Sequence, residues 1–383
     1  MATVFSSLPI IDLSILAKIS PGEQDLRDLS QRLCDVFAST GFAYLINAPL
    51  SYSHEQVFGL ANAFFKVDET EKLKVAKRTF VGTNKNTYRG YFPTQPSQLD
   101  NLKEGFEVGP SRAPRQAGLA RHQRFDLSEP NVWPIGFGHG RPQLESLHQQ
   151  LQSLSGTLLS LLAVGLGKSP DYFASYLTDS LSTLRMLHYP PQQQRTPTTS
   201  QDPRLCCTPH TDSGILTLLH QDPTGGLEVL NADGQWISAP YVPGSIVVNI
   251  GDLMARVSGG RFVATMHRVR TSSASTDRPD GMGRFSVPFF FEPGEDCVVR
   301  SVDGGESIVY GEYVRRKMNT WVEYTDVPGA TLYASSRNGR ISIADRPPRT
   351  HRRETHRNTR NNPDWCASKS VLLSSAMFES FVG

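Results

Sequence analysis

The sequence predicts a mainly β protein with flanking helices, whose core is a sandwich or jelly roll preceded by a helical region. Beyond residue 184, short runs of β-prone residues alternate with turn clusters at regular intervals, which is typical of such folds. Before that point, apolar residues recur at helical spacing behind capping signals. With 383 residues and 38% hydrophobic content, the chain can bury a large core.

Helices are expected at both ends of this core. Residues 20–23 (Ser-Pro-Gly-Glu) are typical of a capping box, and the apolar spacing behind them predicts a helix that Gly41 ends. Residues 53–56 repeat the capping signal ahead of a second helix. Leucines at helical spacing predict a longer helix over 142–165, and a last helix is expected over 310–322.

The β-prone runs predict the strands of the core. Residues 78–142 are rich in Gly, Pro and Arg and predict loops with a few strands. The strands expected after them are 184–189, 215–220, 227–230, 236–238, 245–250, 261–269 and 284–291. Residues 346–360 contain six arginines without apolar periodicity and predict a disordered basic tail. The expected division is an N-terminal domain over 1–125, connecting helices over 126–180, a catalytic domain over 181–327 and the tail over 328–383.

Charge and cysteine content narrow the function classes. Lys and Arg total 39 against 37 Asp and Glu, a balance that argues against nucleic acid or a membrane surface as the partner. Five scattered cysteines do not form a secreted disulfide framework, and the N-terminus lacks the pattern of a signal peptide. We therefore expect a cytoplasmic protein.

Three residues could bind a metal ion. His210 and Asp212 are separated by one residue, so on a strand their side chains would point to the same face. This short motif occurs often by chance, and His267 supplies the second imidazole that a site would need. Two imidazoles and a carboxylate with open positions are typical of non-haem Fe(II) oxygenases. A closed Zn site with Cys206 or Cys207 as fourth ligand is the alternative.

A second pair could bind a carboxylate. Arg284 and Ser286 again share one face of a predicted strand, where a guanidinium and a hydroxyl could hold an anion. An arginine in a salt bridge at a sheet edge is the alternative interpretation of so short a motif.

The order of these motifs resembles a known family. The relevant segments are LRMLHYPP, TPHTDSGILTLLHQDPTGGLEVL, PGSIVVNIGDLMARVSGGRF, MHRVR and RFSVPFFFEP, with LPIIDLS, GFAYL and NLKEGFEVG ahead of them. Together they closely resemble the iron and 2-oxoglutarate dependent dioxygenase superfamily, in the branch that includes isopenicillin N synthase. The resemblance spans residues 8–325.

The resemblance implies a fold, a site and a reaction. The fold would be a double-stranded β-helix, or jelly-roll, core with a helical N-terminal region and a C-terminal helix. His210, Asp212 and His267 would bind Fe(II), while Arg284 and Ser286 would hold the distal carboxylate of 2-oxoglutarate. Tyr189 matches a position whose hydroxyl often helps to bind that co-substrate, although a core tyrosine remains an alternative. The enzyme would consume O2, release succinate and CO2, and hydroxylate, desaturate or rearrange a small organic molecule.

Residues that contact the substrate are expected on the elements that face the iron. The segment RFSVPFFFEP is similar in sequence to fungal oxygenases of secondary metabolism. This similarity favours a small secondary metabolite as substrate. Each candidate could instead pack in the core or lie in a solvated loop. The candidates are Arg89, Tyr91, Leu216 (or Leu218), Phe289 and Phe291.

Two departures and two rival functions accompany the resemblance. The connection over 271–283 is longer than usual, so Arg278 is the fallback for Arg284, and the tail has no counterpart in the family. One rival is an oxidase like isopenicillin N synthase, which keeps the iron site but does not use 2-oxoglutarate. The other is a non-catalytic jelly-roll binding protein, or one whose basic tail docks it on nucleic acid or an acidic partner.

Overall fold

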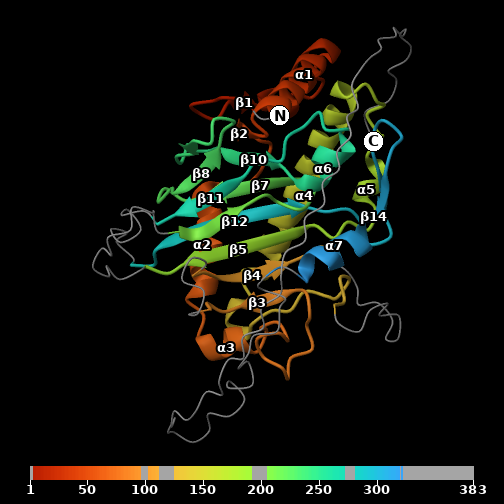
Figure 1. Cartoon of the computed structure of the whole chain (residues 1–383). Coiled ribbons are helices and arrows are strands. Elements are labelled where there is room, and N and C mark those ends of the chain that lie inside the picture. Colours follow the sequence, from red (N-terminus) through yellow and green to blue (C-terminus); the bar gives the residue numbers. More distant parts are fainter. Residues whose placement is uncertain are drawn as a thin grey trace, which may run out of the picture. The chain divides into compact units, whose positions relative to one another are not determined.

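An eight-stranded sheet forms the centre of the fold (Figure 1). The computed structural model describes residues 3–95, 102–111, 125–191, 205–271, 281–319 and 321. The large sheet has the strand order β1-β2-β10-β7-β12-β5-β4-β3, and a four-stranded sheet has the order β6-β11-β8-β9. Two further strands, β13 and β14, form a hairpin. The expected mainly β architecture is confirmed.

The strands have the following bounds. In the large sheet they are β1 (Ile10–Asp12), β2 (Phe42–Ile46), β3 (Gly90–Phe92), β4 (Glu104–Val108), β5 (Thr183–Tyr189), β7 (Leu216–Gln221), β10 (Ile246–Ile250) and β12 (Arg284–Phe291). In the small sheet they are β6 (Leu205–His210), β8 (Leu227–Leu230), β9 (Trp236–Ser238) and β11 (His267–Arg270). The hairpin consists of β13 (Val298–Arg300) and β14 (Ser307–Val309).

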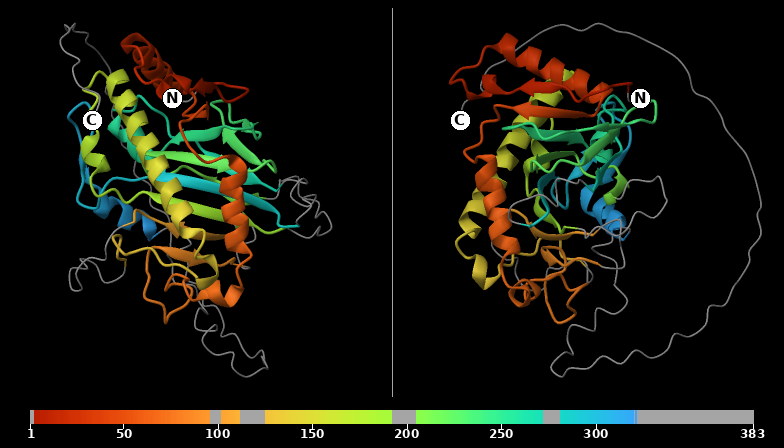
Figure 2. Two further views of the ribbon diagram at one scale, coloured as in Figure 1. Left: turned by 180° about the vertical axis from the view of Figure 1, so that it is seen from behind. Right: turned by 90° about the vertical axis from the view of Figure 1, so that its left-hand side faces the viewer.

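Helices α2 and α4 pack against one face of the large sheet. The helices of the described residues are α1 (Glu23–Ser39), α2 (His54–Phe65), α3 (Glu69–Leu73), α4 (Arg141–Gly165), α5 (Ala174–Leu177), α6 (Asp252–Val257) and α7 (Tyr310–Met318). Helices α2 and α4 cross the sheet on the side away from the small sheet (Figure 2). The capping box ahead of α2 is confirmed, because the Ser53 hydroxyl accepts from the Gln56 backbone and the Gln56 side chain accepts from the Ser53 backbone.

Two apolar layers result from this arrangement. Between the helices and the large sheet lies the larger layer, to which Phe285, Val287, Phe289 and Phe291 of β12 belong. The smaller layer combines residues of both sheets, among them Tyr189 and Val247 of the large sheet and Val229 and Val269 of the small one. Because side chains alternate along a strand, each central strand serves both layers.

Several expectations differ from the structure. The N-terminal half contains β1 to β4, which hydrogen-bond into the large sheet, so this half is not purely helical. Helix α1 begins at Glu23 behind Gly22, and no side chain caps it, so the predicted capping box at Ser20 is wrong. The predicted strand over 261–269 is shorter and begins at His267, because residues 258–263 turn back instead: the Phe262 amide bonds the Ser258 hydroxyl.

Other expectations lie outside the described residues. These are the basic tail, Arg278 and most of the long connection over 271–283. The division of the chain at residues 125 and 180 marks no break in the large sheet, which draws strands from both sides of these positions. In the described part of the chain, no helix combines the length and the apolar character required to cross a bilayer.

Gly41 joins α1 to β2 in a conformation that favours glycine. Its φ is +68°, and a Cβ atom there would lie 2.2 Å from the Val263 carbonyl oxygen. Gly41→Ala should therefore lower the free energy of unfolding by at least about 1 kcal/mol, measured by urea denaturation. Gly59→Ala in α2 is the matched control, because its Cβ would meet nothing within 4 Å. The control should stabilise the protein by about 0.5 to 1 kcal/mol, and equal effects of the two changes would contradict this account.

Candidate metal and co-substrate site

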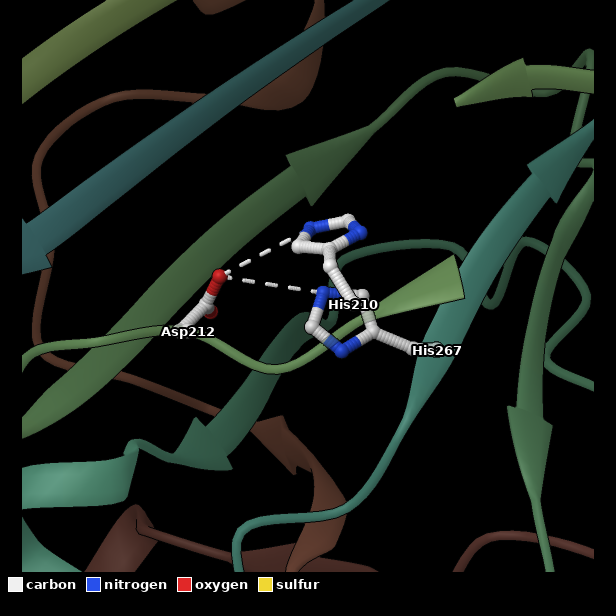
Figure 3. A group of neighbouring side chains, drawn as sticks. All are labelled: His210, Asp212 and His267. Carbon is white, nitrogen blue, oxygen red and sulfur yellow. Dashed lines mark ion pairs between the residues drawn. The ribbon is translucent and has the colours of Figure 1, made fainter. Parts of the chain in front are cut away.

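Two histidines and one aspartate converge between the two sheets (Figure 3). The Nε2 atoms of His210 and His267 lie 3.9 and 3.8 Å from Oδ1 of Asp212. The two imidazole centroids are 4.2 Å apart. The structure thus brings together the three residues that the sequence singles out as metal ligands.

The small sheet and its turns position these side chains. His210 is the last residue of β6 and pairs directly with His267, the first residue of β11. Asp212 lies beyond the end of β6 and not on the strand, and its carbonyl oxygen accepts the Asp252 amide over 2.7 Å. The ring of His267 packs edge-on against Phe42 of β2, at 5.2 Å between centroids. Both sheets therefore contribute to the placement of the triad.

The two oxygens of the Asp212 carboxylate have different partners. Oδ2 accepts from the Thr217 hydroxyl over 2.5 Å and from the Asn249 amide over 2.8 Å. Oδ1 is the oxygen that faces both histidines. Burial alone would raise the pKa of Asp212, but the two imidazoles and these two donors lower it below its ordinary value. The carboxylate is thus held ionised with one oxygen directed at the imidazoles.

The histidines are oriented by the backbone. Nδ1 of His210 lies 2.8 Å from the Thr208 carbonyl, and Nδ1 of His267 lies 3.2 Å from the Thr265 carbonyl. Since a carbonyl only accepts, each Nδ1 carries a proton, and each Nε2 is the nitrogen left to bind a metal. Burial lowers the pKa of His210, but Cys207 and Asp212 raise it to about 9, so a metal would displace the Nε2 proton of His210 at neutral pH. Burial lowers the pKa of His267 to about 4, against the opposing effect of Asp212. A neutral imidazole is the form that binds a metal.

The donor set fits a divalent transition metal with open coordination positions. Two imidazole nitrogens and one carboxylate oxygen lie within 4.8 Å of one another. Neither cysteine belongs to this group, and the Cys207 sulfur lies 3.8 Å from Nδ1 of His210, on the side away from Nε2. The geometry therefore favours an open site over a closed Zn site with a thiolate ligand.

Arg284 presents an unsatisfied guanidinium to the same interior. The residue is 2% exposed, and its Nε donates to the Gly225 carbonyl over 2.7 Å. Gly225 and Gly226 both have positive φ, which bends the turn after β7 so that this carbonyl reaches the strand. Among the described residues, no partner accepts a hydrogen bond from the buried Nη1 of Arg284. A buried cationic donor without an acceptor points to an absent anion.

Ser286 and Tyr189 surround this guanidinium. The Arg284 guanidinium carbon lies 4.8 Å from the Tyr189 ring centroid, and Arg284 pairs with Tyr189 across β12 and β5. Ser286 is buried on the same face as Arg284, two residues along the strand. Burial raises the pKa of Tyr189, so its hydroxyl is a proton donor at neutral pH. All three side chains carry hydrogen-bond donors and lie on the same face of the large sheet.

Four of the five predicted substrate residues do not face this interior, whereas Arg89 bonds Thr183, which pairs directly with Phe290 and so shares the face of Arg284 and Ser286. Leu216, Phe289 and Phe291 lie in the layer between the large sheet and the helices, on the opposite face from Arg284 and Ser286. Tyr91 lies in that layer as well, with its hydroxyl on Glu104. Arg89 is 2% exposed and donates to the Leu181 carbonyl and the Thr183 hydroxyl.

Two residues of the site were not singled out from the sequence. By its sequence pattern Asn249 is a strand-end residue with a structural role, and Thr217 belongs to no motif that indicates a function. Asn249 is the one polar residue of β10, and Thr217 lies between Leu216 and Leu218 of β7. The two residues pair directly and therefore share one face of the sheet. A buried polar residue that interrupts an apolar run is the signal that could have found them.

Comparisons with known proteins agree with this geometry. Residues 180–293 match the model of the 2OG-Fe(II) oxygenase superfamily, and residues 8–135 match the N-terminal model of non-haem dioxygenases in morphine synthesis. The chain is 31% identical to homoarginine-6-hydroxylase 2-ODD-233 of Oryza sativa, over 84% of this chain and 99% of that protein. It is 32% identical to a 2-oxoglutarate-dependent dioxygenase of Didymella fabae, over 77% of this chain and 88% of that protein.

Solved structures give the same result. A full-length Neurospora crassa protein, crystallised in complex with alpha-KG, is similar with a TM-score of 0.68 and 27% identity, over 82% of this chain and 96% of that one. A putative 2OG-Fe(II) oxygenase family protein of Caulobacter crescentus is similar with a TM-score of 0.67 and 26% identity, over 82% of this chain and 99% of that one.

The two donors on Asp212 should matter for metal binding. In the variants Asn249→Leu and Thr217→Val, Oδ2 loses a donor and the carboxylate is free to rotate. We expect metal affinity to fall about 10- to 100-fold, measured with Mn(II) by electron paramagnetic resonance. Thr157→Val is the control, because this exposed hydroxyl bonds the Ser153 carbonyl of its own helix. Unchanged Mn(II) affinity in both site variants would show that the donors do not orient the ligand.

Proposed function

The chain belongs to the 2OG-Fe(II) oxygenase superfamily, and we propose that His210, Asp212 and His267 bind its Fe(II) ion. The protein is an oxidoreductase that uses Fe(II), 2-oxoglutarate and O2 to oxidise a small molecule. The convergence of the three donors supports this assignment of the iron ligands.

Arg284 and Ser286 are proposed to bind the distal carboxylate of 2-oxoglutarate, with Tyr189 beside them. The observation that carries this proposal is the buried Nη1 of Arg284, which has no acceptor among the described residues. A carboxylate would accept from it in a charge-assisted hydrogen bond. The position of Arg284 also fits this role. Arg284 lies on the same face of the large sheet as Thr217 and Asn249, which bond the proposed iron ligand Asp212.

The chain's own residues arrange and shield the chemistry. When bound, iron and 2-oxoglutarate supply the oxidising power, as 2-oxoglutarate and O2 are converted to succinate and CO2 with oxidation of the substrate. Thr217 and Asn249 keep Oδ1 of Asp212 directed at the metal position. Phe42 packs against His267, and the apolar residues shared by the two sheets exclude water around it. The residues thus control placement and access.

The substrate is proposed to be a small organic molecule of fungal-type secondary metabolism. Similarity to dioxygenases of Didymella fabae and Monascus ruber supports this proposal. A cytoplasmic location stays a prediction. The names of these relatives favour the use of 2-oxoglutarate over the rival oxidase, and the presence of all three donors argues against the non-catalytic rival.

Anaerobic titration of the Fe(II)-loaded protein with 2-oxoglutarate tests both assignments. Chelation at an open iron site should produce a weak charge-transfer band in visible absorbance. His210→Ala should abolish the band, because one metal ligand is lost. Arg284→Gln should raise the 2-oxoglutarate concentration needed for half-saturation at least about tenfold, since each charge-assisted hydrogen bond contributes roughly 1.5 to 3 kcal/mol.

Arg27→Gln is the control for the loss of a guanidinium. Arg27 is exposed on α1 and pairs with Glu23, so this variant should titrate like the wild type. A band that forms in Arg284→Gln at the wild-type concentration would contradict the carboxylate assignment. Iron binding without any band in the wild type would favour the oxidase that does not use 2-oxoglutarate.

A further inference from the structure

The turn that carries Asp212 is held by hydrogen bonds to its backbone. Strand β6 ends at His210 and β7 begins at Leu216, so residues 211–215 belong to neither strand. The carbonyls of four consecutive residues in this turn, from Asp212 to Ile215, each accept a hydrogen bond from a helix start or a side chain outside it. These bonds fix the backbone from which the proposed iron ligand projects.

Three of the four bonds come from the start of α6. The first amides of a helix have no acceptor within that helix. Here they donate to carbonyls of the turn: Gly251 to Ile215 over 3.0 Å, Asp252 to Asp212 over 2.7 Å and Leu253 to Gly214 over 3.1 Å. Glycine at position 251 permits the close approach, because a Cβ atom there would lie 2.3 Å from the Gly214 carbonyl oxygen.

The fourth bond comes from α7, a hundred residues further along the chain. The Tyr313 hydroxyl donates to the Ser213 carbonyl over 2.8 Å. Among the described residues, no other group donates to this carbonyl. Tyr313 is 5% exposed, and burial raises the pKa of its hydroxyl to about 12, so the hydroxyl keeps its proton at neutral pH. A protonated donor therefore bonds the residue directly after Asp212.

The same face of α7 also holds the start of α6. Lys317 follows Tyr313 by four residues, which places both side chains on one face of the helix. Nζ of Lys317 donates to Oδ2 of Asp252 over 3.1 Å and lies 5.8 Å from the Tyr313 ring centroid. Asp252 is the residue whose amide bonds the Asp212 carbonyl. Helix α7 thus supports the turn directly through Tyr313 and indirectly through α6.

The side chain and the backbone of Asp212 are held by different groups. Thr217 and Asn249 bond Oδ2, whereas the turn determines how far the residue lies from the two histidines. Oδ1 is 3.9 and 3.8 Å from Nε2 of His210 and His267. A functional site needs its groups within about 0.5 Å of the productive geometry. A shift of the turn would change both distances at once.

We propose that Tyr313 is a positioning residue of the iron site, whose hydroxyl sets the affinity for the metal by fixing the turn that carries Asp212. The inference rests on the proposed function, because it takes Asp212 as an iron ligand. Tyr313 does not touch the metal position and acts through the backbone of Ser213. Helix α7 is therefore part of the metal site, although it supplies no ligand.

Two tyrosine variants test this role. Tyr313→Phe removes one hydroxyl and keeps the ring. Tyr44→Phe is the matched control, because Tyr44 is 4% exposed, donates to the Pro240 carbonyl over 2.6 Å, and has its pKa raised by burial to about 12. Pro240 is neither a proposed ligand nor next to one. Since each variant loses one bond from a buried hydroxyl to a carbonyl, urea should unfold the two metal-free variants at similar, lowered midpoints.

Titration with Mn(II), followed by electron paramagnetic resonance, separates the two variants. We expect Tyr313→Phe to bind Mn(II) about tenfold more weakly than the wild type. Its bound Mn(II) should also give a broader spectrum, because Asp212 would occupy a wider range of positions. Tyr44→Phe should match the wild type in affinity and in line width. His210→Ala, which lacks a proposed ligand, shows whether Mn(II) occupies the triad.

The outcomes distinguish this role from the proposed function. If the wild type binds no Mn(II), or His210→Ala binds it as tightly, the proposed iron ligands are wrong. If binding requires His210 but Tyr313→Phe keeps the wild-type affinity, the positioning role is overturned. Equal losses in Tyr313→Phe and Tyr44→Phe would overturn it as well, because affinity would then follow the stability of the fold. A loss confined to Tyr313→Phe supports the proposal.

Discussion

The central strands of the large sheet are covered on both faces, by helices on one side and by the small sheet on the other. Because side chains alternate along a strand, every second residue enters the interior between the sheets and the others enter the helical layer. On β12 this rule sends Arg284, Ser286 and Phe290 into the interior, and Phe289 and Phe291 into the core. The composition of the site follows from this geometry. If the register of β12 shifted by one residue, the side chains of the interior face and those of the helical face would change places.

The interior face carries the polar groups that form the proposed site. Asn249 and Thr217 fix one oxygen of Asp212, and the turn at Gly225 fixes one nitrogen of Arg284. In each case the structure satisfies one part of a buried polar group and directs the other part into the interior. A fully satisfied set would stabilise the fold alone, whereas a partly satisfied set is arranged to bind something.

Much of this arrangement could be predicted from the sequence, and the limits have physical causes. The family's motif order predicts the triad, whereas the argument that His210 and Asp212 share one face of a strand does not hold, because Asp212 lies beyond the end of β6. The same alternation, counted from Arg284, predicts that Phe289 and Phe291 face the helical layer and not the site. The pairing of Arg185 with Glu107 could not be predicted, since it depends on the register of β4 against β5. That register is a long-range property of the folded sheet.

The most direct test is an anaerobic crystal structure of the protein with Mn(II) and 2-oxoglutarate. The account predicts an ion bonded to Nε2 of His210, Nε2 of His267 and Oδ1 of Asp212. It also predicts the distal carboxylate of 2-oxoglutarate on Arg284 and Ser286. An ion held by other donors, or a carboxylate bound away from Arg284, would contradict it.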